Sequence, residues 1–151
     1  NVHNAKLPDY KGHNSISHAI LNREDIYTTT IHWLAPKVDM GDIIFEQGIK
    51  IEKNDTACSL YEKILQPAVN NFSKLLKYLD EGIELPSYSI EGNGKFYSKH
   101  EIHSLKEIKN PLDWEEINVK YRAFYFPPHE PAFVSVGDQK YYPQIDLLKF
   151  Y

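Results

Sequence analysis

The stretch Tyr27-Thr-Thr-Thr-Ile-His-Trp-Leu-Ala-Pro-Lys-Val-Asp39 decides how this chain is expected to fold. Its first part, residues 27–34, is rich in β-branched side chains, which favour a strand, and Ala35-Pro36-Lys37 then favours a turn. A second strand is predicted over residues 42–51, where alternating side chains follow an apolar run. Two strands joined by a loop that carries Asp39 are therefore the centre of the predicted fold.

Upstream of this stretch, the opening tripeptide Asn1-Val2-His3 holds a carboxamide and an imidazole. Side chains two apart on an extended chain point the same way, so both groups project into one space, and the loop after residue 34 carries Asp39 back toward His3. These groups suit acyl transfer, because a carboxamide N–H stabilises an oxyanion and an imidazole exchanges protons near neutral pH. We expect Asp39 to set the tautomer of His3. From spacing alone, the same residues are also ordinary ends of a strand and a turn.

Helices are predicted on both sides of this region. A short helix is expected to start at Asn14 or Ser15, either of which can cap it, and to end at Asn22. A long helix is expected to begin after residues 54–56, with a kink at Pro67. Its apolar positions recur at helical spacing and predict one stripe that faces the core, made of Leu60, Ile64, Ala68, Phe72, Leu75, Leu76 and Leu79.

The second half of the chain gives weaker signals. Residues 82–111 contain scattered prolines and glycines and are expected to form an irregular connector. Residues 112–126 have helical spacing, and Pro127-Pro128 should stop that helix. A β-hairpin is expected over residues 133–142, with a type II′ turn at Gly137-Asp138.

Composition limits the classes of function. The 151 residues carry 17 basic and 21 acidic side chains, a net charge of −4, which argues against a nucleic-acid partner. No apolar run approaches the ~20 residues of a membrane span, and the single cysteine, Cys58, fits a reducing compartment, so we expect a cytoplasmic protein without a membrane segment. His13 and His18 are five residues apart with no cysteine partner, so no metal site is expected. The only methionine is Met40, which suggests a piece of a longer protein.

Four blocks of the chain, in this order and spacing, resemble the folate-dependent formyltransferases: residues 1–12, 17–22, 28–32 and 38–44. The resemblance is strong over residues 1 to 80. It implies an α/β fold, in which residues 1–82 form the C-terminal portion of a Rossmann-like formyltransferase domain with a mixed sheet and helices. Residues 83–151 would be a small α+β extension of connector, helix and β-hairpin, serving dimerisation or substrate binding. It also implies that an N-terminal half is missing, so residues 1–151 alone should have little or no activity.

The resemblance assigns roles to particular residues. The catalytic Asn, His and Asp of the family fall on Asn1, His3 and Asp39, and 10-formyltetrahydrofolate is the implied co-substrate. Its binding residues would be Leu7, Pro8, Leu34, Ala35, Pro36 and Val38, and those for the acceptor would be Tyr10, Lys11 and Asn14. Lys11 replaces the usual Arg, which keeps the charge but loses a two-pronged contact. His32 is interpreted as a packed or surface strand residue.

Residues 122–142 look like the C-terminal region of the sugar N-formyltransferases of bacterial surface-polysaccharide synthesis, including lipopolysaccharide O-antigen. The expected acceptor is therefore an amino sugar linked to a nucleoside diphosphate, and the expected assembly is a homodimer. Two alternative enzymes are a methionyl-tRNA formyltransferase and a formyltetrahydrofolate hydrolase. A third alternative is a non-catalytic piece that binds sugar nucleotides or dimerises.

Overall fold

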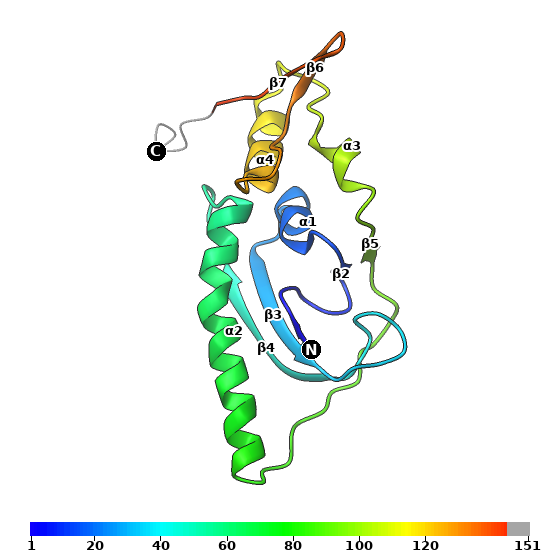
Figure 1. The fold of residues 1–151 in the computed structure, drawn as a ribbon, viewed down its shortest axis with the longest axis vertical. Coiled ribbons are helices and arrows are strands. Elements are labelled where there is room, and N and C mark those ends of the chain that lie inside the picture. Colours follow the sequence, from blue (N-terminus) through cyan, green and yellow to red (C-terminus); the bar gives the residue numbers. More distant parts are fainter. Residues whose placement is uncertain (145–151) are drawn as a thin grey trace.

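The computed structural model describes residues 1–144 (Figure 1). In chain order the elements are β1 (Val2–His3), β2 (Lys11–Gly12), α1 (Ser15–Leu21), β3 (Ile26–His32), β4 (Ile43–Lys50), α2 (Ala57–Asp80), β5 (Phe96–Tyr97), α3 (Ile102–Lys106), α4 (Trp114–Phe124), β6 (Val134–Val136) and β7 (Gln139–Tyr141). Within the described part of the chain, no helix combines the length and apolar character needed to cross a bilayer.

Strands β1, β3 and β4 form a three-stranded sheet in that order, with both pairs antiparallel. The two strands expected from the sequence are confirmed as β3 and β4. Their register places Ile31 opposite Phe45, and an irregularity follows between Ile31 and His32. Helix α2 runs along this sheet (Figure 1), and Ile31, Ile44 and Phe45 pack with Leu75 and Tyr78 of that helix.

Helix α2 begins where the sequence predicted. The Thr56 hydroxyl accepts a hydrogen bond from the Ser59 N–H, and the Ser59 hydroxyl accepts one from the Thr56 N–H, so two free amides of the first turn are satisfied. The helix continues through Pro67 to Asp80. The residue before α1 is Asn14, as expected, but its backbone is left-handed and its side chain makes no capping hydrogen bond.

The predicted core stripe of α2 is only half right. Leu60 and Ile64 are buried, and the same face continues through Pro67 and Asn71. Phe72, Leu76 and Leu79 instead lie on the adjacent flank and are 45–59% exposed. The apolar arc of the helix is wider than the surface that β3 and β4 cover, because positions 72, 76 and 79 are turned by about 90–150° from the buried face.

The connector after α2 is more ordered than predicted. It contains β5, which pairs in parallel with β2, and the short helix α3. The predicted hairpin is confirmed as β6 and β7, joined at Gly137, which has a φ of 58°. In a type II′ turn only the first of the two central residues has a positive φ. Gly137 has one and Asp138 does not, so the turn is of the type that the sequence favoured.

One hydrophobic core links the two halves of the described chain. The buried cluster includes Ala5, Ile20 and Leu60 from the first half, and Tyr97 and Phe124 from the second. A functional boundary at residue 82 therefore does not coincide with a gap in packing. Residues 145–151, assigned by the sequence to the second part, lie outside the described residues.

Candidate active site

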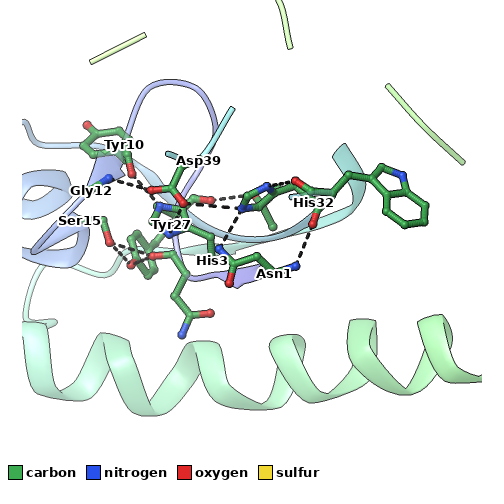
Figure 2. A network of polar contacts seen from close by, with 12 residues as sticks. Asn1, His3, Tyr10, Gly12, Ser15, Tyr27, His32 and Asp39 are labelled. Carbon is green, nitrogen blue, oxygen red and sulfur yellow. Dashed lines mark hydrogen bonds and ion pairs between the residues drawn. The ribbon is translucent and has the colours of Figure 1, made fainter. Parts of the chain in front are cut away.

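The pairing of β1 with β3 gathers three polar side chains. His3 lies opposite Thr30, and the pairing extends one residue further, because the Asn1 nitrogen donates to the His32 carbonyl at 2.9 Å and the His32 N–H donates to the Asn1 carbonyl at 3.0 Å. Residues Asn1, His3 and His32 therefore occupy one face of the sheet (Figure 2). The prediction that Asn1 and His3 share a face is thus confirmed in the structure.

The loop after β3 delivers the carboxylate. Its base is closed by a hydrogen bond of 2.9 Å from the Trp33 N–H to the Asp42 carbonyl. At its tip, Asp39 has a left-handed backbone with a φ of 52°. The Asp39 Oδ2 accepts the Gly12 N–H at 2.9 Å, and the carboxylate is almost buried.

The carboxylate faces both imidazoles (Figure 2). Asp39 Oδ1 lies 3.8 Å from His3 Nδ1 and 3.7 Å from His32 Nε2. These distances are too long for direct hydrogen bonds but lie within the range of an ion pair with a protonated ring. The structure thus brings together all three residues that the sequence nominated as catalytic.

A backbone carbonyl fixes the tautomer of His32. Its Nδ1 lies 2.8 Å from the Trp33 carbonyl, which only accepts, so Nδ1 carries the proton. Burial lowers the pKa of His32, which is 2% exposed, and favours the neutral ring. The unprotonated Nε2 then accepts an N–H from Asn1 Nδ2 at 3.1 Å. The second carboxamide N–H of Asn1 has no hydrogen-bond partner among residues 1–144, so it is available to bind an oxyanion.

A carbonyl also fixes the tautomer of His3, which corrects the expected role of Asp39. His3 Nε2 lies 2.8 Å from the Tyr10 carbonyl and therefore donates to it. The nitrogen left for chemistry is Nδ1, which faces Asp39 at 3.8 Å without a direct bond. Asp39 is placed to pair with the charged ring, but it does not set the tautomer of the neutral one.

A pocket of about 580 Å³ opens beside His3. Its apolar wall includes Tyr61, Phe124 and Phe126. Its polar lining includes Asn14, His13, Ser15, Ser17, Lys99, Lys106, His129 and Glu130. The volume is suitable for a small-molecule ligand. Apart from Asn14 and His3, none of the residues that the sequence nominated lines this pocket.

The other nominated residues are spread over two environments. Leu7 and Tyr10 are buried in the core, so neither side chain presents an exposed surface to a ligand. The Tyr10 ring stacks on Tyr97 and its hydroxyl donates to Glu24 at 2.6 Å, while burial raises its pKa well above the usual range.

Nominated residues on the loops remain accessible. Leu34 and Val38 are 84% and 63% exposed on the loop that carries Asp39, where Pro36 is also exposed and Ala35 partly buried. Pro8 is partly buried, and the Lys11 amine is tied to the Asn93 carbonyl and lies 3.2 Å from Met40 Sδ. Lys11 is therefore engaged by the protein itself.

Two features of the site were not found from the sequence. His32 is packed, as interpreted, but it also orients Asn1, and only the register of β1 against β3 reveals that contact. Part of the pocket wall comes from α3, α4 and residues 126–130, far from the motif in sequence. In the described part of the chain, no group of three or more His, Cys, Asp or Glu side chains is placed to hold a metal ion.

In sequence, this chain is similar to known formyltransferases. A family model described as Formyl transferase matches residues 1–76. A GDP-perosamine N-formyltransferase of Brucella melitensis is 29% identical over 152 residues, covering 99% of this chain and 57% of that protein. The chain thus spans about half the length of the relatives it matches.

Solved structures of formyltransferases have a fold similar to that of this chain. A crystal structure of a 4-N formyltransferase from Francisella tularensis has a TM-score of 0.86 at 21% identity, covering 99% of this chain and 62% of that one. An N-formyltransferase from Helicobacter canadensis, in complex with folinic acid and dTDP-3-aminofucose, has a TM-score of 0.79 at 27% identity, covering 93% and 51%. The expected α/β fold is confirmed.

Proposed function

Because this chain belongs to the formyl transferase family, we propose that it acts in transfer of a formyl group from 10-formyltetrahydrofolate to the amine of a nucleotide-linked amino sugar. The family match supports the reaction. Relatives named for GDP-perosamine and for a complex with dTDP-3-aminofucose support the acceptor, and folinic acid in that complex supports the folate donor. The chain covers 57% of its Brucella relative, so the proposal concerns the full-length protein.

One observation carries the proposal. Asn1, His3 and Asp39 converge on one space, with a free carboxamide N–H and a free imidazole nitrogen directed into it. Attack of an amine on a formyl carbon forms an oxyanion and a positively charged nitrogen. A donor and a proton acceptor are therefore both required at the reacting carbon.

Each residue has a definite task in this chemistry. Asn1 donates its second N–H to the oxyanion, and His32 holds the carboxamide in place for that contact. His3 exchanges its proton at Nδ1, since Nε2 is committed to the Tyr10 carbonyl. Asp39 stabilises the charged His3 ring and receives the proton of the attacking amine. When the intermediate collapses, the bond from the formyl carbon to folate N10 breaks, and N10 takes the proton of His3 Nδ1. Asp39 then returns its proton to His3.

Two surfaces beside these groups suit the two substrates. The exposed apolar side chains of Leu34 and Val38 fit the flat ring system of a folate next to Asp39. The pocket beside His3 suits the acceptor, because Lys99 and Lys106 match phosphate charge and Phe126 offers an apolar face to a sugar or base. The proposal also includes a role in surface-polysaccharide synthesis, a cytoplasmic location, and a homodimer formed with the exposed side chains of Tyr141 and Tyr142 at the end of the hairpin.

The test is formyl transfer by the full-length protein, with 10-formyltetrahydrofolate and a panel of nucleoside-diphosphate amino sugars. Product mass is the readout. His3→Ala should lower turnover by about a hundredfold or more, with modest change in folate affinity. His100→Ala, at an exposed histidine outside the site, is the matched control and should keep full activity.

The outcomes separate the alternatives. Tetrahydrofolate release without a formylated sugar would favour a hydrolase, and formylation of methionyl-tRNA would replace the acceptor. Sugar-nucleotide binding without turnover would favour a non-catalytic module. A loss below tenfold in His3→Ala would reject the assigned role of His3.

A further inference from the structure

We infer that residues 93–97, called the strap here, form a positioning element that sets the orientation of His3 and Asp39 through the loop of residues 8–13. The inference rests on the proposed function and adds to it a set of residues that act through their contacts with this loop. The strap follows α2 and includes β5 (Figure 1).

The loop of residues 8–13 holds both side chains by backbone groups. The Tyr10 carbonyl accepts the proton of His3 Nε2 at 2.8 Å. Two residues later, the Gly12 N–H donates to Asp39 Oδ2 at 2.9 Å. A shift of this short segment therefore moves the imidazole and the carboxylate together.

The strap fixes that segment through hydrogen bonds on both sides of Gly12. The Lys11 N–H donates to the Lys95 carbonyl and the His13 N–H donates to the Tyr97 carbonyl, both at 3.0 Å. The Lys11 amine also donates to the Asn93 carbonyl. Two backbone bonds and one charged bond thus tie the loop to the strap across a large distance in sequence.

Side-chain packing supports the same contact. The Tyr10 ring stacks on the Tyr97 ring, with centroids 5.5 Å apart and planes 11° from parallel. The Asn22 carboxamide donates to both hydroxyls, at 2.9 and 3.0 Å. The loop and the strap are therefore held in register from their buried side as well.

The backbone of the strap lies against Pro8 at Gly94. A Cβ built there would overlap the Pro8 carbonyl. Gly92, just before the strap, also has a positive φ, yet a Cβ there meets nothing within 4 Å. Alanine at either position has the cost of a left-handed backbone, but only alanine at position 94 forces the strap away from the loop.

This pair gives a matched experiment in the full-length protein. Gly94→Ala should lower kcat for formyl transfer by about tenfold to a hundredfold, because small misplacements of reacting groups have effects of that size, while both KM values change by less than about threefold. Gly92→Ala should keep kcat within about twofold. Lys11→Met, which keeps the side-chain stem but loses the bond to Asn93, should give an intermediate loss.

A second readout does not depend on activity. The ¹⁵N resonance of His3 Nε2 reports its hydrogen bond to the Tyr10 carbonyl, so it should shift in Gly94→Ala and stay in place in Gly92→Ala. Thermal unfolding of both variants checks that they fold. If Gly94→Ala does not fold, Lys11→Met carries the same comparison.

Equal kcat values and equal His3 resonances in the two glycine variants would overturn the inference. A parallel rise in KM without loss of kcat would also overturn it, because the strap would then act on binding. If the parent protein transfers no formyl group, the proposed function fails, and the His3 resonances still decide whether the strap positions that ring.

Discussion

At the scale of single residues, the candidate site is organised by backbone carbonyls. The Trp33 carbonyl fixes the proton on His32, and the Tyr10 carbonyl fixes the proton on His3. Each imidazole then presents one nitrogen with a known state: His32 Nε2 accepts from Asn1, and His3 Nδ1 faces Asp39. General acid–base chemistry needs the protonated nitrogen of each imidazole to be defined before a substrate binds.

The sequence predicted the meeting of Asn1, His3 and Asp39, but it did not predict the part played by His32. Alternation along a strand shows which residues share its face. It does not show which residue lies opposite in the neighbouring strand, because that depends on register. The contact between Asn1 and His32 is a matter of register.

Replacing His32 tests its hold on Asn1. His32→Phe keeps a buried ring but removes the acceptor, so the carboxamide rotates freely and kcat should fall by about tenfold or more, with smaller changes in KM. His32→Gln offers a side-chain oxygen to Asn1 and should recover part of the loss. Steady-state kinetics of the full-length protein measures both, and equal kcat values for the two variants would contradict this role.

A second histidine links the fold to pH. His18 is 4% exposed, its Nε2 has no hydrogen-bond partner among the described residues, and its ring stacks on Tyr97. Burial, with the Lys95 charge adding to it, lowers its pKa to about 4, below the 6.5 of the unfolded chain. Below pH 6.5 the unfolded state binds the proton more readily than the folded state. The free energy of unfolding therefore falls as the pH is lowered from about 6.5 to about 4.

We therefore expect the free energy of unfolding to drop by about 2 kcal/mol between pH 7 and pH 5 through His18 alone. His18→Phe keeps a ring against Tyr97 and should remove that part of the drop. Urea denaturation at the two pH values measures it, with the exposed His100→Phe as control. A drop of the same size in both variants would rule out His18 as its source.

At the scale of elements, periodicity and capping signals located β3, β4, α2 and α4 within a few residues. The same signals did not show which side of each element is packed against the rest of the chain. In α2 the apolar arc includes both the buried Leu60 and the half-exposed Phe72, because spacing reports the width of an apolar face and not its neighbours. Strand β5 is two residues long and exists only through its pairing with β2, which no local pattern encodes.

At the start of α2, the local sequence has the largest influence on where the element begins. Thr56→Ala removes the hydroxyl that accepts the Ser59 N–H, and it should lower the free energy of unfolding by about 1 kcal/mol. Ser73→Ala, on the exposed side of the same helix, should change it by less than about 0.5 kcal/mol. Chemical denaturation of the two variants gives the comparison. Equal effects would mean that the cap contributes nothing beyond helix propensity.

At the scale of the whole molecule, one hydrophobic core contains residues from both sides of the functional boundary at residue 82. Phe124 of α4 is 4% exposed and belongs to the same buried cluster as Ile20 and Leu60. Its ring also forms part of the pocket wall. The second half of the chain therefore completes both the packing and the site of the first.

Phe124→Ala should destabilise the fold by about 3–5 kcal/mol, since it opens a cavity in the shared core. The loss should appear in one cooperative transition, seen alike by probes in both halves. Leu112→Ala, at a residue that is 93% exposed, is the control and should be nearly neutral. Two separate transitions, with only one affected by Phe124→Ala, would show that the halves fold independently.

The contact between Lys11 and Asn93 joins residues 82 positions apart. Closing so long a loop costs conformational entropy before the contact gives anything in return, and such contacts form late in folding. During synthesis, the loop around Gly12 emerges from the ribosome long before its partner segment does. His3 and Asp39 therefore stay without this support in the nascent chain until residues 93–97 have emerged and docked against the loop.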